Sequence, residues 1–131
     1  RNELRHEPNH LIDLMSTCVE LAGADYPETI NGRDITPKEG RSLVAGFEGD
    51  RAEERVLMFE HFGKAAIRKG DWKLVRVGAK SPWELYNIKE DRSELNNLRA
   101  KYPVRVAELA KLWKQEADRT LIFPKPVRKK K

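Results

Sequence analysis

The side chains best suited to chemistry are one cysteine and three histidines, and their spacing builds no complete site. Cys18 is the single cysteine, which excludes an internal disulfide framework and a zinc site made from cysteines. His6 and His10 lie four residues apart ahead of an apolar segment. A metal site there would need Glu7 or Asp13 as a further ligand, and nothing in the pattern enforces that geometry. We therefore predict capping or packing roles for both histidines and a core position for Cys18.

The charge distribution argues against a nucleic-acid partner. The 131 residues carry a formal net charge of +5, but five positive charges and no negative ones lie in residues 124–131. Without that segment, basic and acidic residues balance. A nucleic-acid-binding domain usually carries a basic stripe on its folded face, so we predict a solvated basic tail at 121–131. The apolar runs are far shorter than the roughly 20 residues that span a bilayer, so no membrane partner is expected.

The first predicted element is a helix at about 10–22. Asn9 is a plausible N-cap and Gly23 a plausible C′ residue. Apolar residues lie nearly all round this helix, which predicts burial on more than one side. A chain of this length offers little to bury it. We therefore expect that it packs against a larger α/β core, and that the chain, which opens without Met or an apolar region, is cut from a longer protein.

Residues 24–54 predict a long connection. Tyr26-Pro27, Asn31-Gly32, Thr36-Pro37 and Glu39-Gly40 are closely spaced turn signals, and 42–47 could form a short helical turn ending near Gly49. Connections of this length usually belong to functional or docking loops.

From residue 55 the pattern changes to alternating strands, predicted at 56–61, 65–68, 72–77 and 83–88 with short turns between them. A polar turn and a short helical piece follow at 89–98. Apolar residues then recur at helical spacing from Pro103 to Arg119. The fold class is therefore α+β, with a four-stranded antiparallel sheet packed against this helix. Trp72, Trp83 and Trp113 are predicted as sheet–helix core.

Four ordered motifs resemble the C-terminal portion of type I sulfatases, which belong to the alkaline phosphatase superfamily. Residues 10–24 resemble the helix that this family reads as H-L-I-D followed by L-A-G, and 40–43 its G-x-S-L turn. Residues 59–75 resemble E-H-x-G-N-x-A-[VI]-R-x-G-x-W-K-L, and 83–98 resemble W-x-L-Y-D-L-x-x-D-P-x-E-x-x-N-L. The chain departs from these patterns at Ser16, Lys64, Asn87 and Arg92, where the family usually has Pro, Asn, Asp and Pro.

This resemblance implies an arylsulfatase-like sulfuric ester hydrolase, with residues 1–54 as the tail of the catalytic domain and 55–120 as the C-terminal subdomain. For the full-length enzyme it implies a formylglycine nucleophile, a Ca²⁺ ion and a periplasmic or secreted location. Cys18 lies outside any C/S-x-P-x-R motif, so no catalytic or metal residue is expected in this chain, which alone is predicted to be inactive. Its expected partners are the missing N-terminal catalytic domain and, for the parent, a sulfated small molecule or carbohydrate.

His61 ends the first predicted strand beside Glu60. It could belong to a cluster of solvated charges, or, as the resemblance implies, to the substrate rim together with Lys64 and Arg68. Two other functions remain open. One is a fragment of a phosphodiesterase or phosphonate hydrolase of the same superfamily, because the nucleophile motif that separates them is absent here. The other is a free-standing α+β binding module, which would call for a polar first helix.

Overall fold

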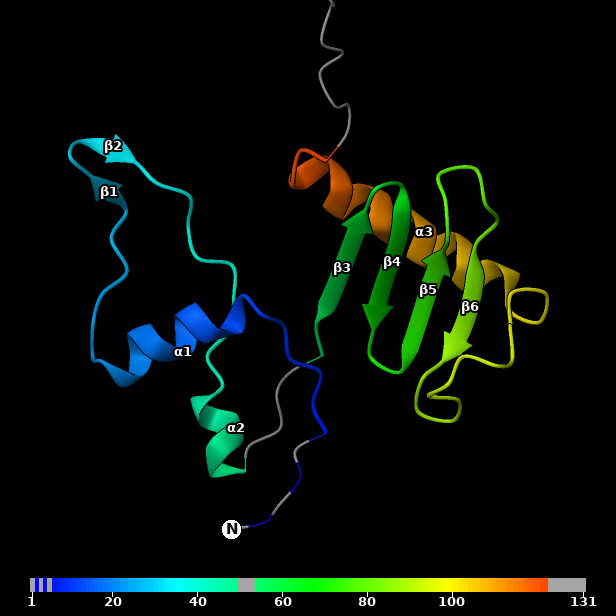
Figure 1. Cartoon of the computed structure of the whole chain (residues 1–131), viewed down its shortest axis with the longest axis horizontal. Coiled ribbons are helices and arrows are strands. Elements are labelled where there is room, and N and C mark those ends of the chain that lie inside the picture. The colour runs from blue at the N-terminus through cyan, green and yellow to red at the C-terminus, as the bar shows by residue number, and fades with distance from the viewer. Residues whose placement is uncertain (1, 3, 5, 50–53, 123–131) are drawn as a thin grey trace, which may run out of the picture. The chain divides into compact units, whose positions relative to one another are not determined.

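The computed structural model describes residues 2, 4, 6–49 and 54–122 (Figure 1). The chain divides into two units, Arg1–Glu53 and Glu54–Lys131. The first has a small interior of polar side chains and the second an apolar core. Most of the predicted basic tail lies outside the described residues. Within the described part, no helix is long and apolar enough to cross a membrane.

The first unit begins with helix α1, Asp13–Leu21, which is shorter than the predicted helix. The prediction of Asn9 as N-cap is wrong. The helix begins after Ile12 without a side-chain cap, because a backbone bond from Asp13 N to His10 O closes a turn just before it. The predicted C′ residue is confirmed, since Gly23 has φ +59° and the chain reverses there in a Schellman-type arrangement.

Three polar side chains of α1 hold the segment 40–43, and we call this arrangement the clasp. Its members on α1 are Asp13, Ser16 and Thr17, all buried, with Asp13 and Ser16 fully so. The Asp13 carboxylate accepts hydrogen bonds from the backbone N–H groups of His10 (2.7 Å) and Arg41 (3.0 Å). Burying a carboxylate is costly unless such donors replace water.

The other two members of the clasp complete the attachment of this segment. Ser16 Oγ donates to the carbonyl of Gly40 at 2.7 Å. Thr17 Oγ1 accepts from Leu43 N at 3.0 Å and donates to the Asp13 carbonyl at 2.8 Å. The clasp therefore joins the two sequence motifs at 10–24 and 40–43, and Ser16, one of the departures from the family pattern, takes part in it.

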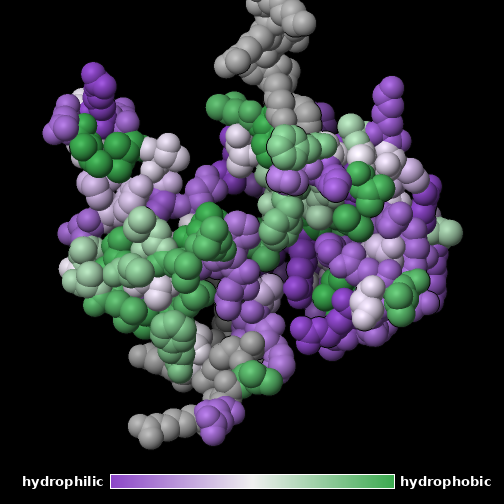
Figure 2. All heavy atoms as spheres, viewed as in Figure 1, coloured by the Kyte–Doolittle hydropathy of each residue, from purple (hydrophilic) through white to green (hydrophobic). Residues whose placement is uncertain are grey.

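Because the polar side of α1 faces the clasp, its apolar side faces outward. Figure 2 shows hydrophobic side chains gathered on the surface over α1. The prediction that Cys18 is a core residue is wrong for this chain, since Cys18 is exposed. The exposed large apolar residues of this surface are Leu11, Ile12, Leu14, Met15 and Leu21. A contiguous apolar surface of this kind is typical of a buried or docking face.

The long connection contains more regular structure than predicted. Strands β1, Thr29–Ile30, and β2, Arg33–Asp34, form a small hairpin. Its turn residues, Asn31 and Gly32, both have positive φ, as this residue pair favours. Two-residue strands leave no alternating pattern in a sequence, so the hairpin escaped prediction. Helix α2, Val44–Glu48, ends at Gly49 in a left-handed conformation, as expected.

The second unit is a four-stranded antiparallel meander in the order β3-β4-β5-β6, with helix α3 across one face (Figure 1). The elements are β3 Val56–His61, β4 Lys64–Lys69, β5 Trp72–Arg76, β6 Glu84–Asn87 and α3 Pro103–Arg119. The α+β prediction is confirmed. The predicted helical piece within 89–98 is wrong, because the Asp91 carboxylate accepts from the N–H groups of Leu95 and Asn96 and Glu94 takes a positive φ.

The apolar core lies between the sheet and α3. Its buried residues are Ala65, Ile67, Leu74, Leu85, Leu109, Trp113 and Ala117. Ile67 and Leu74 are cross-strand partners, as are Leu74 and Leu85, so one row of side chains crosses three strands beneath the helix. Trp72 and Trp83 pack against this core, which confirms the predicted role of the three tryptophans.

The motif at 83–98 closes the edge of the sheet at β6. The Asn97 side chain accepts from Leu85 N at 3.2 Å, and Leu98 N donates to the Leu85 carbonyl at 2.8 Å. An unpaired edge strand would otherwise expose these groups for pairing with another chain. Asn87, a departure from the family pattern, still supplies an acceptor, because its Oδ1 receives the N–H of Lys89 at 3.1 Å.

Candidate functional site

Two of the three predicted rim residues lie at one end of the sheet. His61 ends β3, Lys64 begins β4, and the two are cross-strand partners. Both are exposed. Cross-strand partners project their side chains from the same face of a sheet, so the imidazole and the ammonium group can approach one ligand. Together they offer hydrogen bonding and positive charge to an anion.

The turn between them is unusual because its first residue is a phenylalanine. Phe62 and Gly63 have φ of +50° and +86°, a pair of positive values that defines a type I′ hairpin turn. The Phe62 side chain is 86% exposed, and its ring meets that of His61 edge-on at 4.5 Å between centroids. A bulky residue with positive φ is strained. The short turn predicted between the strands at 56–61 and 65–68 is confirmed, but no role was predicted for Phe62.

Two contacts fix the conformation of this turn. A carboxylate oxygen of Glu60 accepts the N–H of Gly63 at 2.9 Å. Gly63 also lies against the loop between β5 and β6, since a Cβ placed on it would be 3.6 Å from Ala79 N. The Ala79 carbonyl in turn accepts a hydrogen bond from Arg76 Nη1 at 3.3 Å. These contacts link two neighbouring loops at the end of the sheet that carries His61.

Arg76 anchors this loop pair to the core. Its guanidinium carbon lies 4.7 Å from the ring centroid of Trp83 and 4.9 Å from that of Trp113. The two indole rings meet edge-on at 5.7 Å, and Trp113 Nε1 donates to the Phe59 carbonyl at 3.3 Å. Cation–π contacts on two rings hold the guanidinium in place. The loops are thus positioned by the same tryptophans that fill the core.

The third predicted rim residue is elsewhere. Arg68 lies four residues along β4 from Lys64, which is about 13 Å at the rise of a strand, and it pairs with Leu57 at the start of β3. Its Nε donates to the Gly70 carbonyl at 2.9 Å, which holds the opposite turn. The structure therefore brings His61 and Lys64 together and separates Arg68 from them.

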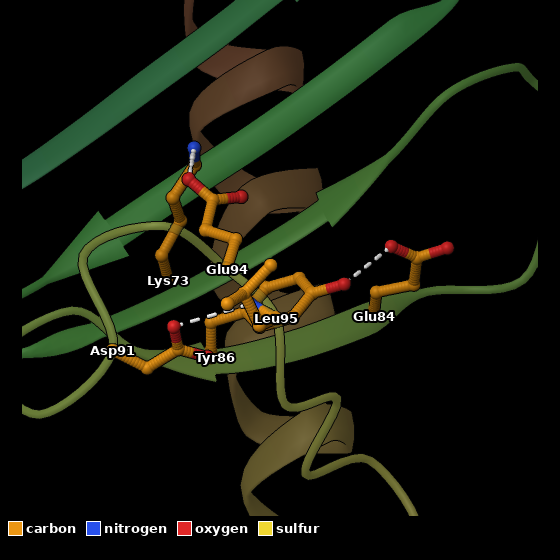
Figure 3. A network of polar contacts seen from close by, with 6 residues as sticks. All are labelled: Lys73, Glu84, Tyr86, Asp91, Glu94 and Leu95. Carbon is orange, nitrogen blue, oxygen red and sulfur yellow. Dashed lines mark hydrogen bonds and ion pairs between the residues drawn. The ribbon is translucent and has the colours of Figure 1, made fainter.

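A second group of polar side chains surrounds Tyr86, on the sheet face away from α3 (Figure 3). Tyr86 is 6% exposed and its hydroxyl donates to Glu84 at 2.8 Å. Its cross-strand partner, Lys73, pairs with Glu94 from the loop that follows β6. In that loop, the N–H groups of Asn96 and Leu95 lower the pKa of Asp91. The group fixes the loop against the sheet.

Tyr86 predicts a pH dependence of stability. Burial, and next its bond to Glu84, raise the pKa of Tyr86 from 10.0 to about 12. The folded state therefore retains a proton that the unfolded state loses between these values. The free energy of unfolding should fall as pH rises through this window, by on the order of 2 kcal/mol from this group. Denaturant unfolding at pH 9 to 12 measures it. The free energy of unfolding of the Tyr86→Phe variant should fall less steeply with pH. Equal pH slopes for the variant and the unaltered chain would contradict the assignment to Tyr86.

The described residues do not fit the metal that the family resemblance implies. No group of three or more His, Cys, Asp or Glu side chains that could hold a metal ion occurs in residues 6–49 and 54–122. Cys18 is followed by Val19 and Glu20, which form no formylglycine modification motif.

Comparison with known proteins gives one consistent family name, although no family model matches the chain. The chain is 34% identical over 110 residues to an uncharacterized sulfatase of Schizosaccharomyces pombe, covering 79% of this chain and 20% of that protein. It is 27% identical over 119 residues to arylsulfatase K of Danio rerio, covering 85% of this chain and 22% of that protein. The chain thus spans about a fifth of the length of these curated relatives.

A solved structure shares the fold. It is a protein in complex with its substrate, D-glucosamine-2-N,6-O-disulfate, with a TM-score of 0.59 and 22% identity. The match covers 89% of this chain and 25% of that protein. At this identity the likeness supports the fold alone.

Proposed function

This chain is a C-terminal, sulfatase-like portion, and we propose that it helps to shape the substrate cleft of a catalytic domain that hydrolyses sulfuric esters. The observation that carries the proposal is the 34% identity to a sulfatase over most of the chain. The chemistry belongs to residues outside this chain. The contribution of this chain is a preformed surface, and two of its features fit that role.

The first feature is the exposed apolar surface of α1. It includes Leu14, Met15 and Leu21, and burying such side chains contributes about 1.5–3 kcal/mol each. We propose that this surface packs against the catalytic domain. A free-standing binding module would leave it in water, which is unfavourable. For this reason we favour the interpretation as part of a larger sulfatase over the interpretation as an independent binding module.

The second feature is the pair formed by His61 and Lys64. A sulfate ester carries a negative charge, which an exposed ammonium group attracts and an imidazole can hydrogen-bond. We propose that these two residues lie at the rim of the cleft and bind the substrate without taking part in bond cleavage. Arg68 holds a turn at the other end of the sheet, so we propose no substrate contact for it.

The proposal is tested by measuring kcat and KM of the full-length protein for an aryl sulfate and for D-glucosamine-2-N,6-O-disulfate. The ester with the higher kcat/KM is the preferred ester. Lys64→Ala should raise KM for its preferred ester about two- to fivefold with kcat unchanged, because an exposed charge contributes up to about 1 kcal/mol to ground and transition state alike. Arg68→Ala is the matched control, since it removes a cation from the same strand.

Each outcome of this experiment bears on the proposal. An equal rise in KM with Arg68→Ala would contradict the placement of the rim at the His61 end. Turnover of a phosphate diester but of no sulfate ester would favour the phosphodiesterase alternative. The 131-residue chain alone should give no turnover of the aryl sulfate, and measurable activity would contradict the view that the catalytic residues lie outside it.

A further inference from the structure

Resting on the proposed function, we infer that Phe62 is a stacking residue for the sugar ring of a sulfated carbohydrate. The side chain stands at the tip of the β3–β4 hairpin, 86% exposed. An exposed aromatic ring at a loop tip contributes nothing to the core of this unit. The ring is free to contact a ligand, which we identify as the sugar.

The backbone at Phe62 supports a functional reason for this residue. A type I′ turn needs positive φ at both central positions and strongly favours Asn-Gly. Gly63 satisfies this preference, whereas Phe62 adopts φ +50° with a bulky side chain. Asn31 occupies the same position in the β1–β2 hairpin of this chain, at φ +53°. Strain of this kind persists where the surrounding structure imposes it, and it concentrates at binding sites.

The neighbours of Phe62 fit a sulfated sugar in particular. The His61 ring meets the Phe62 ring edge-on, which leaves a face of the phenyl ring open to a flat apolar partner. The axial C–H groups of a pyranose form such a partner for the electron-rich face of an aromatic ring. Lys64, the cross-strand partner of His61, supplies a positive charge beside it. An aromatic ring and a cation on the same hairpin suit a sugar ring that carries an anionic sulfate.

The backbone of the turn that carries the Phe62 ring is supported in advance. Gly63 lies against Ala79, the Ala79 carbonyl accepts a hydrogen bond from Arg76, and the Arg76 guanidinium lies over two tryptophan rings at the core. A group fixed in advance loses less entropy when a ligand binds. The loop pair described above therefore serves as the support of Phe62.

The test measures binding separately from turnover. The full-length protein and its Phe62→Asn and Phe62→Trp variants are titrated with D-glucosamine-2-N,6-O-disulfate by calorimetry, and Tm is recorded for each. Phe62→Asn should weaken Kd about threefold to tenfold while Tm stays equal or rises, because Asn suits the turn. Phe62→Trp should bind at least as tightly as the unaltered protein.

Three results would overturn the inference. They are an unchanged Kd for Phe62→Asn, a Phe62→Trp variant as weak as Phe62→Asn, and no saturable binding of this sugar to the unaltered protein. A fourth result, a lower Tm for Phe62→Asn, would also overturn it, because Phe62 would then pack against another part of the protein. Because sulfate ester turnover is measured separately, failure of the proposed function is distinguishable from failure of this inference.

Discussion

Gly40→Ala should detach the segment 40–43 from α1 and abolish the clasp. A Cβ on Gly40 would lie 2.1 Å from the Ile12 carbonyl oxygen and 2.9 Å from Asp13 Cα. Both are backbone atoms, so no side chain can rotate away to relieve the overlap. Separating the segments would break the bond from Arg41 N and leave the buried Asp13 carboxylate short of a donor. We expect a loss of about 3 kcal/mol or more for this local structure.

Hydrogen exchange of the backbone amides of Arg41 and Leu43 measures this loss, because each is bonded to a side chain of α1. Both amides should be protected in the unaltered chain and exchange freely in Gly40→Ala. Gly46→Ala is the matched control, since a Cβ there meets nothing within 4 Å and alanine favours the helix in which Gly46 lies. Equal protection in Gly40→Ala and Gly46→Ala would contradict the role of the clasp.

The clasp also shows where sequence reasoning reached its limit in the first unit. The predicted helix at 10–22 contains Asp13 near its N-terminus, where acidic residues are favoured, and the structure has Asp13 in the first turn of α1. Its partner, the amide of Arg41, lies 28 residues away. Local spacing carries no information about such a contact. The same limit explains Cys18, because the apolar pattern of α1 predicted burial without indicating that the polar side faces the rest of the unit.

The second unit was more predictable because its patterns are local. Pro103 begins α3 and Arg119 ends it, as the helical spacing indicated. Strand β3 has its predicted bounds and the other three strands differ by one or two residues, since each alternates and short turns separate them. The polar loop at 89–98 was misjudged, because the side chain of Asp91 binds backbone N–H groups that a helix would use.

The candidate site was predicted in part. His61 and Lys64 flank a two-residue turn, so their proximity follows once the strand bounds are known. The same strand bounds place Arg68 four residues from Lys64, and the rise per residue of a strand predicts the separation between them. The sequence did contain a signal for Phe62. A two-residue hairpin turn favours asparagine before glycine, and a phenylalanine precedes Gly63 here. The support that Arg76 gives through two tryptophans is a tertiary contact, and no spacing in the sequence indicates it.

Trp113→Ala should cause a large loss of stability in the second unit and disturb the candidate site as well. The side chain is 6% exposed, and truncation of a buried tryptophan costs about 3–5 kcal/mol. The tryptophans of the 131-residue chain are Trp72, Trp83 and Trp113, so indole fluorescence during denaturation of this chain reports on the second unit. Val104→Ala is the matched control on the same helix, where the side chain is 71% exposed and the change should stay within about 0.5 kcal/mol.

A double-mutant cycle with Arg76→Met separates packing from the cation–π contact. Methionine keeps the apolar stem of Arg76 and removes its charge. If the guanidinium is held by the ring, the two substitutions should show a coupling energy of about 1 kcal/mol. Additive losses would mean that Arg76 lies beside Trp113 without being held by it. The loops that carry Ala79 and Phe62 would then need another support, so this cycle tests both the stability of the core and the rigidity that sugar stacking requires.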